Sequence, residues 1–430
     1  MKQKLLAISI KTAVILASAL AGFLLSGPIN DMATMFGSTP QQHSARAAWS
    51  NFASRIEDLG HRILQDDFPN QTDRQRAEGI RQLAHVIVDG IKWEFDNANA
   101  EFTGLTVINT DTTGWGGPNV DNKYIRGRID GKSTYLLTGN INNIYDIAIQ
   151  TNKGDLHMGQ IGTSKTLDRS TLIVDDNGDF TVTISPESHD GNWIQQGPDH
   201  SAVTLRVYYL DWNTHQPAQF HLIKKGNEGL APPPLTEREA AQRLANATHW
   251  IEANLIGWDK WLKVATVNDK DNQPRAPRSV DGGSATLLYG SIPFNLAPGE
   301  AMIIEVEDPQ ARYFSFQTYN YGWFDAGDYA HRQTSLNNLQ THISSDGMIR
   351  LVVAADDPGI SNWIDTEGRQ RALVTYRYMS AKNPHKPTVS VVPFEALADH
   401  LPADTARISP QQRKAVIASR QRHVQLRFHN

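Results

Sequence analysis

The chain has 430 residues, with 41 Lys and Arg against 46 Asp and Glu, and a formal net charge of −5. We expect no nucleic-acid partner, because such a surface carries clustered Lys and Arg and this chain is mildly acidic. The absence of cysteine excludes disulfides, thiol nucleophiles, cysteine-ligated metal centres and a lipoprotein anchor. The length suits two domains.

The first residues have the pattern of an export signal. Lysines precede an apolar core over residues 12–25, and a small-residue segment with proline follows it. We expect residues 1–46 to be an export signal or membrane anchor with its linker, since a cleaved signal and an uncleaved anchor both fit the length. The remainder is expected to be periplasmic, or anchored in the inner membrane and facing the periplasm.

Residues 47–71 are expected to contain a stalk or packing helix. Apolar side chains recur there every three or four positions, which is the spacing of one helix face. They are Trp49, Phe52, Ile56, Leu59 and Ile63.

The body of the chain consists of two segments, residues 72–225 and 236–395, that carry the same landmarks in the same order. Each opens with the capping-box pattern of a helix start, at Thr72 and at Thr236. Four matched blocks follow, at 145–151 and 312–318, 180–184 and 349–353, 192–194 and 362–364, and 203–206 and 374–377. We interpret the two segments as tandem copies of one unit.

The fold class predicted from these segments is mainly β. Short alternating strands with frequent Gly, Asn and Asp turns favour two tandem jelly-roll or β-sandwich units, each preceded by a helix. Residues 226–235 combine glycines with three prolines and are expected to be the linker between the units.

Residues 396–430 are expected to end in a basic helix over 410–428. It begins after Ser409 with proline at its first position. We expect its basic face to be solvated, and binding to a membrane surface or a partner is the less favoured alternative.

Three blocks of the first unit carry a resemblance: DNGDFTV at 176–182, HDGNWI at 189–194 and RVYYLDW at 206–212. They resemble the bacterial domain-of-unknown-function family twelve-fourteen. The resemblance implies a β-sandwich or jelly-roll protein in an exported context, and it implies no particular activity. The second unit keeps the Asn-Trp-Ile and Arg landmarks but lacks the Asp-Trp pair, so it resembles a diverged copy.

The duplication sorts residues into two groups. Residues that both copies keep are more readily explained by the shared fold, and residues of one copy are better functional candidates. Trp193 and Trp363 are therefore expected to plug the end of each sandwich. Arg206 and Arg377 fit either a grip on a carboxylate ligand or an internal ion pair with a nearby Asp or Glu, and the ion pair is the more common arrangement.

Two loops that the copies do not share are candidates for ligand binding. Residues 114–122 are rich in glycine, and residues 319–331 are rich in aromatic and acidic groups. Flat Trp and Tyr faces beside Asp and Asn suit a sugar ring, whereas an ordinary strand connection fits the first loop equally well. The ligand-binding candidates are Trp115, Asn119, Asp121, Asn122, Tyr124, Arg206, Tyr321 and Trp323.

Catalytic candidates are weaker. Glu187, His189 and Asp190 lie together in one loop, and Asp325 and Asp328 lie in another. They could form an acid–base pair, but acids in turns usually face water. The spacing of Asp325, Asp328 and His331 is not a recognised metal signature, so we expect no metal and no cofactor. Whether the chain is an enzyme stays open.

The leading hypothesis is an exported cell-envelope or periplasmic protein that binds a carbohydrate or a similar polar ligand through aromatic loops between two β units. The first alternative is a glycan-directed hydrolase that uses the loop carboxylates. The second is a structural or assembly module without catalysis, for which a homo-oligomer is expected.

Overall fold

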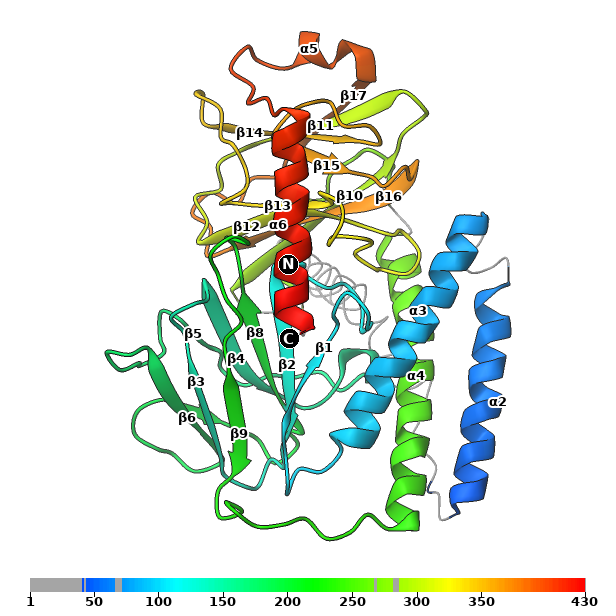
Figure 1. Cartoon of the computed structure of the whole chain (residues 1–430), viewed down its shortest axis with the longest axis vertical. Helices are drawn as coiled ribbons and strands as arrows, with labels where there is room; N and C mark the ends of the chain where they lie inside the picture. Colours follow the sequence, from blue (N-terminus) through cyan, green and yellow to red (C-terminus); the bar gives the residue numbers. More distant parts are fainter. Residues whose placement is uncertain (1–40, 42–43, 66–71, 267–268, 281–285, 430) are drawn as a thin grey trace, which may run out of the picture.

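The structure is a computed structural model that describes residue 41 and residues 44–65, 72–266, 269–280 and 286–429. Two β-rich halves follow one another along the long axis, and long helices lie beside them (Figure 1). Most of the predicted export segment lies outside the described residues. Within the part that is described, no helix combines the length and the apolar character that crossing a membrane requires.

The first half contains two sheets that enclose one apolar core. Every neighbouring pair of strands is antiparallel except β6 and β7, which are parallel. One sheet has the order β1 (Leu105–Ile108), β2 (Asn122–Arg128), β8 (Ala202–Tyr208), β4 (Asp146–Asn152) and β5 (Leu167–Asp168), and the other has the order β7 (Trp193–Gln195), β6 (Asp179–Ser185), β3 (Tyr135–Asn140) and β9 (Phe220–Lys224).

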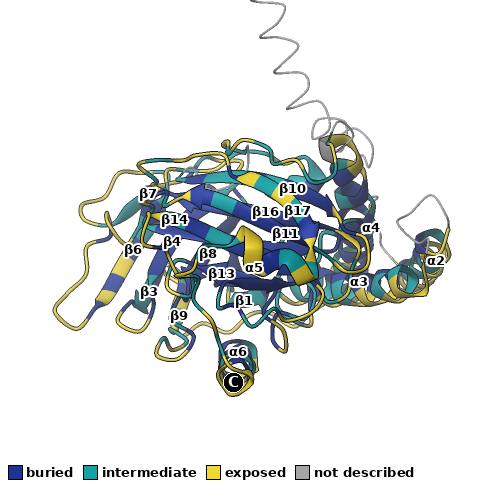
Figure 2. Cartoon of the chain, turned by 90° about the horizontal axis from the view of Figure 1, so that it is seen from above, coloured by how far each residue is buried: buried dark blue, intermediate teal, exposed yellow. Residues whose placement is uncertain are grey.

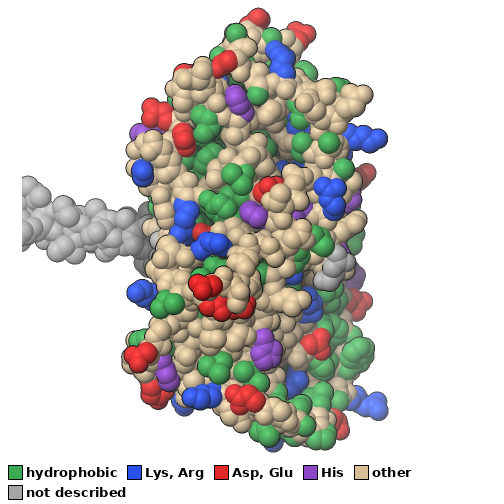
Figure 3. All heavy atoms as spheres, turned by 60° about the vertical axis from the view of Figure 1, so that its left-hand side comes forward, with side chains coloured by type: hydrophobic (Ala, Val, Ile, Leu, Met, Phe, Trp, Pro, Cys, Tyr) green, Lys and Arg blue, Asp and Glu red, His purple; other side chains and the backbone are tan. Residues whose placement is uncertain are grey.

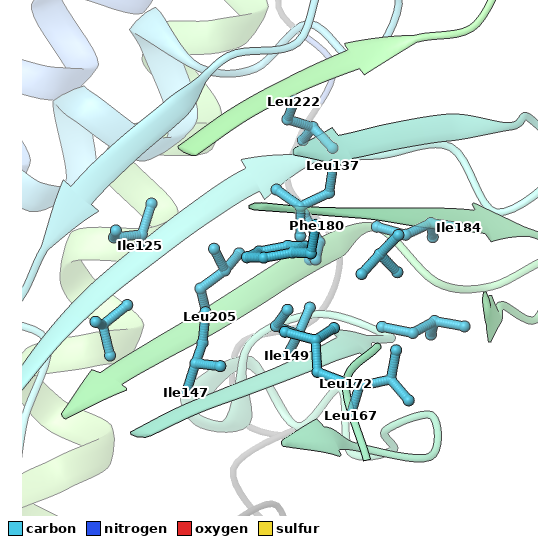
Figure 4. Packing of buried hydrophobic residues seen from close by; sticks show 14 of the residues in the cluster. Ile125, Leu137, Ile147, Ile149, Leu167, Leu172, Phe180, Ile184, Leu205 and Leu222 are labelled. Carbon is cyan, nitrogen blue, oxygen red and sulfur yellow. The ribbon is translucent and has the colours of Figure 1, made fainter. Parts of the chain in front are cut away.

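Alternation along the strands places the apolar side chains of both sheets between them. Ile125 and Leu205 come from one sheet and meet Leu137 and Phe180 from the other (Figure 4). Strand periodicity therefore accounts for most of this core, and residues of the connections, such as Ile141 and Leu172, complete it.

The second half repeats the strand order of the first. Its sheets have the order β10 (Leu287–Asn295), β16 (Arg371–Met379), β12 (Tyr313–Tyr319) and β13 (Ser335–Asn337), and the order β15 (Trp363–Asp365), β14 (Met348–Ala354), β11 (Glu300–Glu307) and β17 (Thr388–Pro393). The first order corresponds to β2-β8-β4-β5 and the second to β7-β6-β3-β9. The pair β14 and β15 is parallel, as β6 and β7 are.

Three helices pack together beside the halves. They are α2 (Ala45–Ile63), α3 (Asp73–Ile91) and α4 (Glu237–Thr266), and α3 continues into a π-helical turn, η1 (Lys92–Asp96). The predicted capping box is present at the start of α3, where Thr72 and Gln75 bond each other reciprocally. Apolar side chains of all three helices share one cluster with Trp323 of the second half. With a 30-residue α4, the described chain is mixed α and β, and the prediction of a mainly β chain was wrong in that respect.

Short helices complete these elements: η2 (Leu156–Met158) in the first half, and η3 (Phe394–Ala396) with α5 (Leu397–His400) after the second. Residues 226–235, the predicted linker, contain no helix or strand. On the face drawn in Figure 3, acidic and basic side chains of the described residues are interspersed.

The two halves meet through the sheet that contains β8 and the sheet that contains β16, which we call the inner sheets. Tyr208 and Leu210 from the first half share an apolar cluster with Leu287, Tyr313 and Met379 from the second. The rings of Tyr208 and Tyr313 lie 5.3 Å apart, edge to face. The strands of the second half are mostly buried when the molecule is seen from above (Figure 2).

A final helix, α6 (Pro410–Phe428), runs across both halves with the bounds predicted from the sequence (Figure 1). The expectation of a solvated basic face was wrong for three of its residues, whereas Lys414 and Arg422 are exposed. Arg413, Arg420 and Arg427 are spaced seven residues apart and are only 7%, 2% and 0% exposed. We call these three side chains the arginine ladder, and the spacing places them on one face of the helix.

Each guanidinium of the arginine ladder has partners on the β-rich halves. Arg413 pairs with Asp357 at 2.9 Å in the second half. Arg420 donates to the carbonyl oxygen of Ser335, also in the second half, and its guanidinium lies 4.7 Å from the ring of Trp212 in the first. Arg427 donates to the carbonyl oxygen of Val120 at 2.5 Å. The helix therefore holds the two halves together.

We expect Arg420→Ala to lower the free energy of unfolding by about 2–4 kcal/mol, because it removes buried packing and leaves buried carbonyl groups without donors. Arg422→Ala is the matched control, since Arg422 is exposed on the same helix and its loss should change stability by less than about 0.5 kcal/mol. Chemical denaturation followed by tryptophan fluorescence measures both. Equal effects would contradict the role of the arginine ladder.

Candidate functional site

A cavity of about 220 Å³ lies where the inner sheets meet. Strands β2 and β8 of the first half and β10 and β16 of the second contribute to its wall, and α4, the glycine-rich loop, residues 275–280 and Phe324 also line it. Each half thus supplies only part of the wall. We call this space the interhalf cavity.

Aromatic side chains form much of the wall. Trp258 and Trp261 of α4 lie 5.5 Å apart, edge to face, and each ring lies 5.7 Å from the ring of Phe324. The remaining aromatic lining residues are Trp115, Tyr124, Tyr208 and Tyr289. Such rings offer flat apolar faces, and the indole and phenol groups add hydrogen-bonding atoms.

The glycine-rich loop predicted to line a ligand site does line the interhalf cavity. Gly116 has a φ of 127°, and a Cβ atom there would lie 2.6 Å from Nε1 of Trp258. Gly117 has a φ of 56°, and a Cβ atom there would overlap the ring of Phe324. Glycine therefore serves both the backbone conformation and the close approach of the loop to the aromatic wall.

Two buried arginines line the interhalf cavity, one from each half. Arg206 and Arg377 are 9% and 5% exposed. Arg206 lies opposite Tyr124 across β8 and β2, and Arg377 lies opposite Tyr289 across β16 and β10. The two halves therefore present the same Tyr–Arg pair to the cavity.

The predicted internal ion pair of these arginines was wrong for the described residues, where no carboxylate lies within 4.0 Å of either guanidinium. Arg377 donates instead to the hydroxyl oxygens of Tyr319, at 2.6 Å, and Thr375, at 3.2 Å. Nη1 of Arg206 is buried and has no hydrogen-bond partner in the described part of the chain. Both guanidinium groups are thus held beside the cavity without a countercharge of their own.

The lining is positively charged. Arg275 and Arg278 join Arg206 and Arg377, and among the described lining residues there is no Asp or Glu. Arg275 forms an ion pair with Asp269, which is not a lining residue. Burial raises the pKa of Tyr124 and of Tyr208, so both phenols stay protonated and can donate hydrogen bonds at neutral pH.

The amide and acid candidates of the glycine-rich loop divide into two groups. Asn119 and Asn122 line the interhalf cavity. Asp121 instead lies in the packed interface, where its carboxylate accepts hydrogen bonds from Tyr313 at 2.9 Å and Asn337 at 2.7 Å. It also accepts one from Nε1 of Trp212 at 3.1 Å. Burial raises the pKa of Asp121.

The aromatic candidates of the second loop lie elsewhere. Trp323 is buried among the helices, where its indole donates to the carbonyl oxygen of Gln75 at 3.3 Å. The guanidinium of Arg371 lies 4.7 Å from the ring of Tyr321. Neither aromatic residue lines the interhalf cavity, whereas Phe324 of the same loop does.

The catalytic candidates do not come together. Glu187, His189 and Asp190 are exposed in the loop after β6, and none of them lines the interhalf cavity. Asp325 pairs with Arg81 at 2.5 Å, and Asp328 contacts His331 at 2.7 Å. Among the described residues, no group of three or more His, Asp or Glu side chains is placed to hold a metal ion.

A buried polar network lies behind Trp115. The indole of Trp115 donates to Nδ1 of His157 at 2.9 Å. Asp155 pairs with Arg126 at 2.5 Å and accepts from the indole of Trp250 at 2.8 Å. Trp115 is therefore both a cavity residue and part of the packing of the first half.

Sequence reasoning missed Trp258, Trp261, Tyr289, Arg275 and Arg278 as cavity residues. Trp258 and Trp261 are spaced three residues apart at the end of α4, which places both on one helix face. That spacing is the signal that could have drawn attention to them. The arginines carry no comparable signal, because their position depends on how the two halves dock.

The fold and the site define a protein of two similar β-rich halves with a ligand-sized cavity between them. Residues 124–210 match the family described as Protein of unknown function (DUF1214), which confirms the resemblance inferred from the sequence blocks. The matched segment begins with Tyr124 in β2 and includes Arg206 and Tyr208 of β8.

Solved structures are similar over most of the chain. An uncharacterised protein from Burkholderia cenocepacia matches with a TM-score of 0.74 and 26% sequence identity, over 81% of this chain and 97% of that one. The VPA0106 protein from Vibrio parahaemolyticus matches with a TM-score of 0.44 and 10% identity, over 80% of this chain and 99% of that one, which is too distant to support an argument. No curated protein matches the chain.

We expect the buried network to make stability depend on pH through His157. Burial is the main reason that the pKa of His157 is lowered to about 4, and the electrostatic effects of Arg126 and His249 lower it further. The carboxylate of Asp155 acts in the opposite direction and raises this pKa. An unfolded histidine has a pKa of about 6.5. As the pH falls from about 6.5 toward 4, the unfolded chain binds a proton that folded His157 does not, so the free energy of unfolding falls by up to about 1.4 kcal/mol per pH unit.

Denaturation between pH 7.5 and 5 measures this dependence, and His157→Gln should reduce it, since a glutamine side chain does not titrate and can still accept from Trp115. Asp89 acts in the opposite direction, because burial raises the pKa of its carboxyl group to about 6. Comparing the variant with the parent removes this contribution of Asp89. The exposed His189→Gln is the control. Parallel pH profiles of the parent and His157→Gln would refute the expectation.

Proposed function

We propose that this chain is a binding protein that holds a small ligand with a flat apolar face in the interhalf cavity. The observation that carries the proposal is the cavity itself, about 220 Å³ in volume and lined by aromatic side chains from both halves. Concave, mostly apolar sites with a few polar groups are where small molecules usually bind. The proposal treats the halves as tandem β-sandwich units that form the site by docking.

A sugar ring and an aromatic ring both fit this description. Either one presents flat faces that stack on Trp258, Trp261 or Tyr289, and the amides of Asn119 and Asn122 offer hydrogen bonds at the edge. A periplasmic or cell-envelope location, expected from the first residues of the chain, would expose the site to envelope glycans and imported solutes. We therefore include carbohydrate among the ligands.

Hydrolysis receives less support than binding. A glycosidase needs two carboxyl groups on either side of the bond that it cleaves. The described lining of the interhalf cavity contains neither Asp nor Glu, and the exposed loop of Glu187 offers no enclosed site.

We expect Ser291→Phe to weaken ligand binding by at least about tenfold, because Ser291 lines the interhalf cavity and a phenyl ring there would occupy it. The parent would be titrated with 2-naphthamide and with methyl glucoside, and binding would be followed by the fluorescence of the lining tryptophans and by calorimetry. At least one probe should bind.

Ser390→Phe is the matched control, because Ser390 is exposed on β17 of the same half and lies away from the cavity. It should leave binding unchanged. Failure of both probes and of their acid counterparts, 2-naphthoate and methyl glucuronide, to bind the parent would refute the proposal, as would equal loss of binding in the two variants.

A further inference from the structure

Arg206 and Arg377 are buried cations that line the interhalf cavity, one from each half. A buried charge is costly unless a countercharge or hydrogen bonds compensate for it. Other buried arginines of the chain are compensated in one of these ways: Arg126 and Arg369 have carboxylate partners, and Arg420 and Arg427 donate to backbone carbonyl oxygens. Arg206 and Arg377 have none among the described residues, and both face the interhalf cavity.

The position of the two arginines is repeated in the two halves. Each occupies an internal strand of its inner sheet and lies directly opposite a tyrosine on the neighbouring strand, Tyr124 for Arg206 and Tyr289 for Arg377. When the inner sheets dock, the two equivalent pairs come to line one cavity. A group bound there can contact a guanidinium from each half.

Arg377 is held in place before any ligand arrives. Its guanidinium donates to Tyr319 and Thr375 and lies 5.8 Å from the ring of Tyr289. Arg206 differs, because its buried Nη1 keeps an unused donor. One guanidinium is thus fixed by the protein, and the other has an unsatisfied buried donor that a ligand can reach only when the side chain shifts toward the cavity.

The geometry points to a carboxylate as the polar group of the ligand, bound between Arg206 and Arg377, with the flat body of the ligand against the aromatic wall of α4. This inference rests on the proposed function and names the chemical class of its ligand. A carboxylate offers two oxygens in the plane that suits a guanidinium fork, and charge-assisted hydrogen bonds are about twice as strong as neutral ones. Aromatic acids and sugar acids share this chemistry.

Two matched pairs of probes separate charge from shape. The first pair is 2-naphthoate and its neutral amide, 2-naphthamide, and the second pair is methyl glucuronide and its neutral counterpart, methyl glucoside. Comparing the two pairs also distinguishes a ligand with an aromatic body from one with a sugar body. In at least one pair the carboxylate should bind the parent protein roughly tenfold or more tightly than its neutral partner, as measured by calorimetry at pH 7.5.

Substitution of the arginines should remove this preference. In Arg206→Gln and in Arg377→Gln the charged and the neutral probe should bind within about twofold of each other. Arg206→Lys keeps the charge without the fork and should retain part of the preference. Arg350→Gln is the control, because Arg350 pairs with Glu305 and Asp346 outside the cavity. Melting temperatures identify any variant that fails to fold.

The outcomes distinguish the two proposals. Equal binding of the charged and neutral members in the parent overturns the carboxylate inference and leaves the proposed function standing. A preference that survives in both Gln variants also overturns it. If no probe of either pair binds, the proposed function fails and the carboxylate inference fails with it.

Discussion

The face-to-face docking of the inner sheets is the interaction on which the rest of the structure depends. At its centre the buried carboxylate of Asp121 accepts hydrogen bonds from Trp212 of the first half and from Tyr313 and Asn337 of the second. A buried carboxylate with several donors holds its partners in a defined geometry. This interface sets the geometry of the interhalf cavity, because the walls of the cavity belong to different halves.

The helices reinforce the same interface from two sides. The aromatic residues of α4 close the interhalf cavity, and the arginine ladder of α6 joins Trp212 of the first half to Ser335 of the second. Arginine is suited to this task because its long side chain packs on aromatic rings while its planar group satisfies several carbonyl oxygens. Small displacements of one half against the other would therefore be opposed on both sides.

Local signals in the sequence predicted the elements well. The capping box at Thr72, the bounds of α6 and the matched strand blocks were all readable, because they depend on residues close together in the chain. The sequence did not predict how the two halves and the helices pack against one another. Nothing near Trp323 indicates that it packs among the helices rather than beside a ligand, and nothing near Arg420 indicates that it is buried. Those outcomes depend on which surfaces meet.

The duplication also misled in one respect. We considered residues kept by both copies more readily explained by the fold and favoured an internal ion pair for Arg206 and Arg377, although Arg206 stayed among the ligand-binding candidates. Arg206 and Arg377 are kept by both, yet they line the cavity without carboxylate partners among the described residues. When two copies dock through the same face, a shared residue can serve a joint site, because repetition places it on both walls. A residue that both copies keep can therefore belong to a binding site as well as to the fold.

The arginine ladder has a consequence for the cohesion of the two halves. Arg420 can contact Trp212 of the first half and Ser335 of the second at the same time only when the halves are docked. The packing of α6 and the association of the halves therefore stabilise each other, and weakening either one weakens the other.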